Sequence, residues 1–212
     1  MRNYILIGDS GHGKVIEDSI VASHGKVIAK LDDKYSTVFQ EGPYLKGPLS
    51  AIHELIQEDT KVIISIGHNP IRKKIVERLK LDEDKYGIVI HPSAIISPSI
   101  TIQNGTVIMP NVVVNADSFI GNHVILNTGS IVEHDCRVYE YAHISPGAVL
   151  TGGVTVGEGS QIGAKSSVNP LVNIGHWSII GAGSTVIKDI PDNVTAVGIP
   201  TKVIKKEGFL ND

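Results

Sequence analysis

The chain has 212 residues, of which 42% are hydrophobic and 19% are charged, a composition that excludes disordered and collagen-like proteins. A formal net charge of -3 gives no electrostatic basis for binding nucleic acid or an acidic membrane surface, so small-molecule substrates are expected. No run of about 18 apolar residues occurs, and a single cysteine suits a reducing compartment. We therefore expect a cytoplasmic protein without a membrane partner.

The first third of the chain, residues 1–84, alternates expected strands and helices. Apolar runs indicate strands at 4–7, 26–31 and 61–66, and longer amphipathic segments indicate helices at 14–23, 50–57 and 71–80. Such alternation predicts a Rossmann-like α/β domain with a small parallel sheet. Ligands bind such sheets at the carboxyl ends of their strands.

Glycine or polar residues follow all three of these strands. The turn 8–13 reads G-x-x-G-x-G and leads into a helix, so it presents backbone N–H groups to an anion such as a phosphate. Its spacing differs from the dinucleotide fingerprint G-x-G-x-x-G, which favours a mononucleotide-like group over a nicotinamide cofactor. Asp32 and Asp33 follow the second strand, and Gly67 and Asn69 follow the third. Tight turns alone would explain the glycines, but three such strand ends together favour a ligand site.

The remainder, residues 85–212, carries a strict six-residue repeat. Every sixth residue from Ile96 to Val186 is Ile, Leu or Val; we call these the hexad residues. Small side chains stand mostly four residues after them, and Gly or Asn often stands one residue after them, where we expect corners with positive φ. Three sides of six residues make a coil of about 18 residues, which predicts a parallel β-helix with a C-terminal tail.

One histidine of the repeat has the surroundings of a general base. His134 stands between Glu133 and Asp135, and a carboxylate beside an imidazole can orient the ring for proton transfer. Its neighbours one coil away are Ala116 and Gly152, which are small enough to leave a groove. The alternative is an ordinary solvated surface histidine. Cys136, at a small inward position, is interpreted as core filler and not as a nucleophile.

A second histidine, His143, stands nine residues after His134, half of the expected coil perimeter. This step places the two histidines on opposite sides of one solenoid. If both serve one site, that site lies between subunits.

These motifs resemble those of a known enzyme family. The hexads resemble the hexapeptide acyltransferases, whose β-helix is left-handed and which usually form trimers. The opening G-x-S-G-H-G, the Leu-Asp-Asp after the second strand, the Ile-Gly-x-Asn after the third and the block 127–136, NTGSIVEHDC, resemble the sialic acid O-acyltransferase (NeuD) family. They are most similar to the PglD-type enzymes that N-acetylate UDP-linked 4-amino-dideoxysugars with acetyl-CoA in bacterial surface glycan biosynthesis.

The resemblance implies a role for each matching residue. His134 would be the general base and Asp135 its orienting carboxylate. His12, from a neighbouring subunit, would join Asn127 and His143 around the acceptor and thioester. The nucleotide would be held by Gly11, Gly13, Asp32, Asp33, Gly67 and Asn69. Acetyl-CoA would lie along the solenoid of a homotrimer, near His143, Gly152, Ala164, Gly181 and Lys202, the last from an ending that differs from the family pattern at Thr201.

Three rival functions stay open at this point. The same scaffold could O-acetylate a sialic acid or another sugar hydroxyl, since His134 would serve either acceptor. A zinc hydratase would need His123, His134 and His143 to converge, and their spacing does not favour this, so no metal is expected. A non-catalytic binding module is the third.

Overall fold

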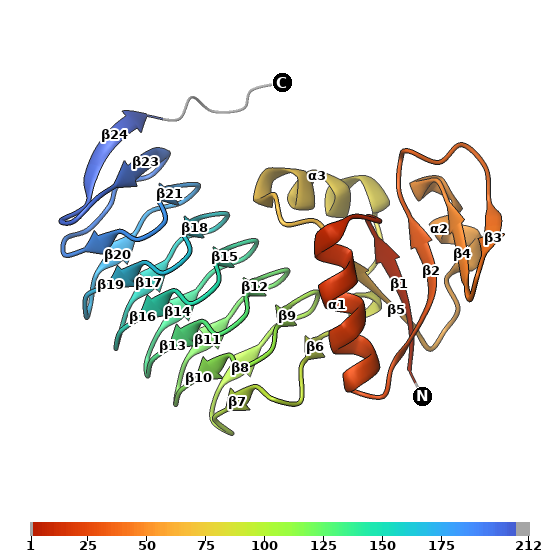
Figure 1. The fold of residues 1–212 in the computed structure, drawn as a ribbon, viewed down its shortest axis with the longest axis horizontal. Coiled ribbons are helices and arrows are strands. Elements are labelled where there is room, and N and C mark those ends of the chain that lie inside the picture. Colours follow the sequence, from red (N-terminus) through yellow and green to blue (C-terminus); the bar gives the residue numbers. More distant parts are fainter. Residues whose placement is uncertain (1, 207–212) are drawn as a thin grey trace.

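A computed structural model describes residues 2–206; the last part of the expected tail, 207–212, lies outside them. The N-terminal α/β domain lies against the first coils of a long solenoid, whose later coils extend away from it (Figure 1). None of the helices within residues 2–206 has the length and apolar character needed to cross a lipid bilayer.

The N-terminal domain is built on a five-stranded sheet in the order β3-β4-β2-β1-β5. Its parallel strands are β1 (Asn3–Ile7), β2 (Lys26–Leu31), β4 (Tyr44–Gly47) and β5 (Thr60–Ile64). Strand β3 (Phe39–Glu41) runs antiparallel to β4. The helices are α1 (Gly11–Ala22), α2 (Ile52–Leu55), α3 (Asn69–Leu79) and the 3-10 helices η1 (Leu49–Ala51) and η2 (Glu83–Lys85). The expected Rossmann-like sheet is confirmed, with one hairpin more than the sequence predicts.

That hairpin, β3 with β4, was not predicted because its strands are short and lack a clear apolar alternation. The Gly42-Pro43 pair forms its turn, where Gly42 has a φ of 56°. Strand β4 then pairs with β2 through Leu45 and Lys46, which places Lys46 at the edge formed by the carboxyl ends of the strands.

The two faces of the sheet bury different partners. Ile5 and Ile7 of β1 pack into the cluster that also contains Ile75 of α3. Tyr4 and Leu6, on the other face of β1, share a cluster with Ile16 of α1 and with solenoid residues. Helix α1 is therefore held between the sheet and the solenoid, and the two domains share one apolar interface.

The solenoid has three faces of stacked parallel strands, except that the last strand, β24, runs antiparallel to β23. The eight-strand face contains β6 (Val89–Ile90), β9 (Val107–Ile108), β12 (Ile125–Leu126), β15 (His143–Ile144), β18 (Gln161–Ile162), β21 (Ile179–Ile180), β23 (Val194–Val197) and β24 (Lys202–Lys206). The six-strand face contains β7 (Ile95–Ile96), β10 (Val113–Val114), β13 (Ile131–Val132), β16 (Val149–Leu150), β19 (Ser167–Val168) and β22 (Thr185–Val186). The five-strand face contains β8 (Thr101–Ile102), β11 (Phe119–Ile120), β14 (Arg137–Val138), β17 (Thr155–Val156) and β20 (Asn173–Ile174).

The coils stack in a constant register. Val114 pairs with Val132, and Val132 pairs with Leu150, so equivalent residues of neighbouring coils stand 18 apart. Ile96 and Ile102, at the open end, are partly buried, and the other hexad residues are all buried. The predicted left-handed parallel β-helix is confirmed. The expected domain border between residues 84 and 85 stays a prediction; it falls within η2, just before the first solenoid strand, β6.

The corners of the coils differ from the expectation. Positive φ occurs three residues after the hexad residues and not one residue after, as at Gly105, Asn111, Asp117, His123, Gly129, Asp135 and Tyr141. The glycines one residue after are needed for a different reason. A Cβ on Gly121, Gly157 or Gly163 would come within 2.8, 2.7 or 2.5 Å of backbone atoms of the next coil. These glycines permit close approach between coils.

The small residues four after the hexad residues link successive coils. The Ser118 hydroxyl donates to the carbonyl of Glu133 (2.8 Å) and accepts from the Cys136 N–H (3.1 Å). Ser160 makes the same pair of bonds with Gly175 and Ser178. Cys136 is fully buried, and burial raises the pKa of its thiol to about 11. The thiol is therefore a core residue, as its position in the repeat predicts.

The packing of β21 offers a matched test of the solenoid core. Ile180 is fully buried, whereas its neighbour Ile179 is 41% exposed on the outer face of the same strand. Ile180→Ala should lower the free energy of unfolding by about 2 to 5 kcal/mol because it leaves a cavity between coils. Ile179→Ala should lower it by less than about 1 kcal/mol. Denaturant unfolding at one protein concentration measures both, and equal effects would contradict the assigned orientation of the strand.

Candidate active site

His134 lies at the corner between the six-strand and five-strand faces, directly after β13. Its Nδ1 is 2.8 Å from Oδ2 of Asp135, and Asp135 itself occupies the left-handed corner position with a φ of 60°. The hydrogen bond to Asp135 is the largest influence and raises the pKa of His134; desolvation opposes it, and the charges of Asp135 and Glu133 add smaller upward effects. Both side chains are about two-thirds exposed, at 63% and 66%. The ring is thus oriented through Nδ1, which leaves Nε2 to meet a substrate.

The imidazole of His134 lies over Gly152 of the next coil. A Cβ at Gly152 would be 2.6 Å from Cε1 and 2.7 Å from Nε2 of the ring, so a side chain there would displace the imidazole from this position. The Asp135 N–H donates to the Ala116 carbonyl (3.0 Å), and the Gly153 N–H donates to the His134 carbonyl (2.9 Å). The backbone of His134 is therefore fixed from both neighbouring coils, at the small residues that the repeat spacing predicts.

A second polar cluster lies on the eight-strand face. Nδ2 of Asn127 is 3.0 Å from Nε2 of His143, so the amide donates and the ring carries its proton on Nδ1. The ring of His12 lies beside it, with 6.3 Å between centroids. Burial, with the charge of Arg72, lowers the pKa of His143 to about 3 and that of His12 to about 4. Both rings are consequently neutral near pH 7.

His12 is brought to the second cluster by α1. The family resemblance implies that His12 reaches the site of His134 from a neighbouring subunit, and this stays a prediction; within one chain its ring lies beside that of His143. The reason is that α1, which begins at Gly11, packs directly on the eight-strand face.

The two histidine clusters lie on different parts of one solenoid. His143 belongs to β15 of the eight-strand face, and His134 lies at the corner between the other two faces. The hydrogen bonds within residues 2–206 do not connect His134 to His143 or Asn127. The placement agrees with the nine-residue step in the sequence, and each chain presents two separate parts of the proposed site.

Two of the expected acetyl-CoA residues lie on the same edge as Asn127. Ala164 and Gly181 follow β18 and β21 as Asn127 follows β12, so all three lie along the edge between the eight-strand and six-strand faces. A Cβ on Gly181 would be 2.6 Å from Cγ1 of Val197, which explains the glycine by packing. Lys202 is exposed in β24, opposite Val197 of β23.

The turn 8–13, where the sequence predicts phosphate binding, leads into α1. Helix α1 begins after Ser10, whose side chain makes no capping hydrogen bond, and the space around Gly11 is open. Gly13 is buried, and a Cβ there would lie 3.2 Å from the Gly8 carbonyl oxygen. Gly11 is therefore available to a ligand, whereas Gly13 serves the packing of α1 on the sheet.

Three of the expected nucleotide ligands, Asp32, Asp33 and Asn69, make contacts within the protein. Asp32 accepts from the N–H groups of Asp9 (2.9 Å) and Lys34 (3.1 Å), which fixes two loops of the sheet edge. Asp33 forms a two-bond ion pair with Arg78 at the surface (2.6 and 3.1 Å). Each carboxylate therefore has a structural contact within the domain, and its remaining acceptor sites leave its role as a nucleotide ligand a prediction.

Asn69 is the third residue with a changed role. Its side chain is 3% exposed; Nδ2 donates to the Gly159 carbonyl (2.9 Å), and Oδ1 accepts from Arg72 (2.9 Å). Asn69 therefore joins α3 to the solenoid in place of the expected nucleotide contact. Gly67, two residues earlier, has open space around it and stays available to a ligand.

Comparison with known proteins identifies the family. The PglD N-terminal domain family matches residues 3–79. A curated relative, UDP-N-acetylbacillosamine N-acetyltransferase of Bacillus subtilis, is 46% identical over 109 residues, a match that spans half of this chain and half the length of the relative. A mutant of perosamine N-acetyltransferase from Caulobacter crescentus, solved with CoA and GDP-perosamine, is 36% identical over 96% of this chain and 97% of its own, with a TM-score of 0.86. The chain belongs to the PglD-type sugar N-acetyltransferases.

A second solved member of the PglD-type family gives the same result. The acetyltransferase domain of PglB from Neisseria gonorrhoeae, in complex with acetyl coenzyme A, is 35% identical and covers 96% of this chain and 99% of its own, with a TM-score of 0.87. The match extends over both domains, so the family assignment does not rest on the solenoid alone.

Sequence reasoning missed a charged cluster at the edge of this PglD-type domain. Asp9 accepts from the Tyr35 hydroxyl (2.6 Å) and lies 3.0 Å from Nζ of Lys46 and 3.6 Å from Nζ of Lys34. Burial acts to raise the pKa of Asp9, but the hydrogen bonds from Tyr35 and Lys46 and the lysine charges lower it to about 2. Lys34 lies in a loop and Lys46 in the unpredicted strand β4. Both are distant from Asp9 in the sequence and approach it only in the folded domain.

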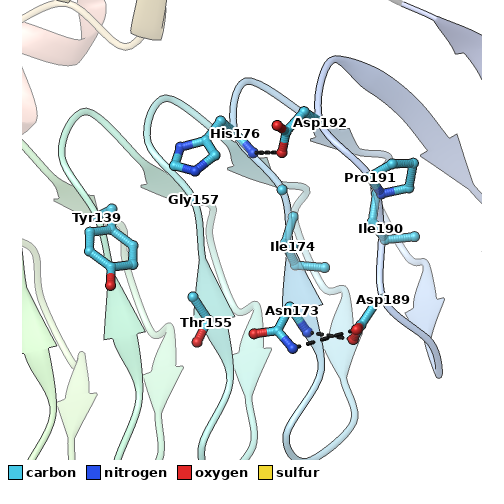
Figure 2. A pocket seen from close by; sticks show the side chains of 11 residues that line it. Tyr139, Thr155, Gly157, Asn173, Ile174, His176, Asp189, Ile190, Pro191 and Asp192 are labelled. Carbon is cyan, nitrogen blue, oxygen red and sulfur yellow. Dashed lines mark hydrogen bonds between the residues drawn. The ribbon is translucent and has the colours of Figure 1, made fainter.

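A pocket of about 460 Å³ lies away from both histidine clusters (Figure 2). It opens on the five-strand face, between Tyr139 and the segment that contains Asp189 and Asp192. Asp192 accepts from the His176 N–H (2.7 Å) and Asp189 from the Asn173 N–H (2.8 Å). These bonds hold the segment on the last coil, and the pocket contains none of the predicted site residues. No group of three His, Cys, Asp or Glu side chains in the described range could hold a metal ion.

The contact between His134 and Asp135 can be tested by titration. Asp135→Asn keeps the shape of the side chain, and Asn tolerates positive φ, but the negative charge is lost. Because the hydrogen bond to Asp135 raises the pKa of His134, the pKa of His134 should be lower in Asp135→Asn. NMR titration of the ring protons measures it, with Asp117→Asn at an equivalent corner as the control. An unchanged pKa in Asp135→Asn would contradict the contact.

Proposed function

We propose that this protein is an acetyl-CoA-dependent N-acetyltransferase that acts on the amino group of a UDP-linked 4-amino-dideoxysugar in bacterial surface glycan biosynthesis. The observation that carries the proposal is the His134 ring, oriented by Asp135 and seated on Gly152 at a rigid corner. The relatives support the substrate class, since one is named for UDP-N-acetylbacillosamine and another was solved with CoA and GDP-perosamine.

In the proposed reaction His134 is the general base. The sugar amine is mostly protonated near pH 7, so it first loses one proton to solvent and must lose another as its nitrogen attacks the thioester carbon. Nε2 of His134 takes that proton while the C–N bond forms, and Asp135 stabilises the imidazolium. The C–S bond then breaks, and the proton passes from His134 to the departing sulfur of CoA. The N–H of Gly152, beside the ring, would donate to the oxyanion.

The assembly is part of the same proposal. The His134 corner and the edge that carries Asn127, Ala164 and Gly181 lie on different sides of one solenoid, so a complete site needs two chains. In a cytoplasmic homotrimer the corner of one subunit would face that edge of the next. Acetyl-CoA would lie between them, with Lys202 near its phosphates, and Gly11 and Gly67 would hold the nucleotide.

The direct test is incubation with acetyl-CoA and a panel of UDP-, GDP- and CMP-linked amino sugars, with the product and its modified position read by mass spectrometry. We expect one acetyl group on the amino nitrogen of a UDP-linked sugar. His134→Ala should lower kcat by about 10² to 10⁴ because the base is lost, while acetyl-CoA binding is retained. His53→Ala, on exposed α2, is the control. Acetylation of a hydroxyl would favour the O-acetyltransferase alternative. A fully active His134→Ala would contradict the proposed role of His134 as the general base.

The shared site can be tested by mixing two inactive variants. His134→Ala and His143→Ala remove groups that the proposal assigns to different subunits of one site. Trimers assembled from equal amounts should regain activity in about a quarter of their sites, because a site works when one chain supplies His134 and the other supplies His143. The measurement is acetyl transfer after co-refolding or co-expression. Mixed trimers as inactive as either parent would contradict a site between subunits.

A further inference from the structure

Arg72 of α3 is buried between the two domains, with a side chain only 1% exposed. Its Nε donates to the carbonyl of His123 (2.9 Å) and its Nη2 to the carbonyl of Tyr141 (2.6 Å), both on solenoid corners. Its Nη1 donates to the carbonyls of Ile66 (3.0 Å) and Gly67 (3.3 Å), in the loop after β5. One planar group therefore bonds to both domains at once.

The charge of Arg72 has no carboxylate partner among the hydrogen bonds of the described residues. Its acceptors are backbone carbonyls and the side-chain oxygen of Asn69 (2.9 Å). Burial lowers the pKa of the guanidinium to about 9, which keeps it charged near neutral pH. Burying a cation without a neutralising partner costs free energy, so apolar residues at this position would stabilise the docking of the two domains more than Arg72 does.

The hydrogen bonds of Arg72 connect two segments near the proposed acceptor site: the Ile66–Gly67 loop and the corner before His143. The Ile66–Gly67 loop ends β5 at the ligand-binding edge of the sheet, and the carbonyls of Tyr141 and Ala142 directly precede His143. A shift of this loop relative to the corner would move a bound nucleotide sugar relative to His143.

We propose that Arg72 is a positioning residue for the reaction: it holds the Ile66–Gly67 loop in a fixed relation to the corner that leads into His143. A nucleotide sugar bound by the N-terminal domain then presents its amine at one defined place. This inference rests on the proposed function, and it adds a residue that touches no substrate itself.

The charge of Arg72 has a second effect on the same site. The groups that act on His143 are Arg72 from α3, His12 from α1 and the backbone of Gly67; after burial, Arg72 is the next largest cause of the low pKa of His143. An amino sugar arrives mostly as a cation, so a charged imidazole at this place would repel it. Arg72 helps to keep both rings neutral where the amine must bind.

Lys73, the next residue of α3, provides a matched control. Its Nζ lies 2.7 Å from Glu158 and 5.2 Å from the ring centroid of Trp177, so it also joins α3 to the solenoid. The ion pair and the ring contact of Lys73 do not involve the Ile66–Gly67 loop. A variant of Lys73 therefore weakens the docking of α3 without altering the contacts of this loop.

The experiment compares Arg72→Lys, Arg72→Met and Lys73→Met in the full chain. Both Arg72 variants should raise KM for the UDP-linked amino sugar by about tenfold or more, because a released Ile66–Gly67 loop must be ordered when the nucleotide binds, while KM for acetyl-CoA stays near wild type. The pKa of His143, followed by NMR, should rise in Arg72→Met and stay low in Arg72→Lys, which keeps the charge. Lys73→Met should lower Tm and leave both KM values unchanged.

The outcomes separate positioning from adhesion. A folded Arg72→Lys with wild-type KM for the sugar overturns the proposal, and this variant decides the matter if Arg72→Met does not fold. Equal KM changes in Lys73→Met would assign the effect to loose docking and also overturn it. Failure of the proposed function itself is recognised separately, because the wild-type protein would then acetylate no sugar of the panel, whereas the pKa of His143 can still be compared between variants.

Discussion

The constant register between coils is the constraint on which the rest of the structure depends. Parallel pairing of each strand with the strand 18 residues later forces the hexad residues to stack inward and every corner to lie above an equivalent corner. Surface residues are thereby ordered into columns along the solenoid. The imidazole of His134 meets Gly152 because the two share a column. Two backbone hydrogen bonds, from the Asp135 N–H to the Ala116 carbonyl and from the Gly153 N–H to the His134 carbonyl, hold the corner that carries the ring. A general base needs this kind of support.

The N-terminal domain uses the solenoid as a surface for packing. Helix α1 is buried between the sheet and the eight-strand face, and α3 is joined to the corners by Asn69, Arg72 and Lys73. The docking buries polar groups as well as apolar ones. His123, fully buried, stacks on Tyr141 with 5.2 Å between ring centroids, and burial lowers its pKa to about 3. Neutral rings at such an interface avoid further unpaired charge beside Arg72.

The positions of residues in the six-residue repeat could be predicted from the sequence. The contacts of residues at the interface between the two domains could not. The hexads predicted the solenoid, the neighbours of His134 and the separation of His134 from His143, because the position of a residue in a regular coil follows from its spacing along the chain. Asn69 looked like a ligand residue at a strand end, yet a carbonyl 90 residues later takes its amide. The cluster around Asp9 depends on Lys46, in a strand too short to leave a pattern. The contact between His12 and His143 could not be predicted because the docking of α1 on the solenoid leaves no pattern in the sequence.

The same register sets how this kind of protein can change in length. Because the coils stack about 4.8 Å apart, a gain or loss of one whole coil beyond Trp177, where the contacts of α3 described above end, would lengthen or shorten the solenoid without turning any remaining side chain to a new face. A single inserted residue within a coil would rotate every later corner and expose the hexad residues. Changes in size at this end are therefore tolerated in steps of 18 residues, and the distance from the N-terminal domain to the His134 corner stays constant through them.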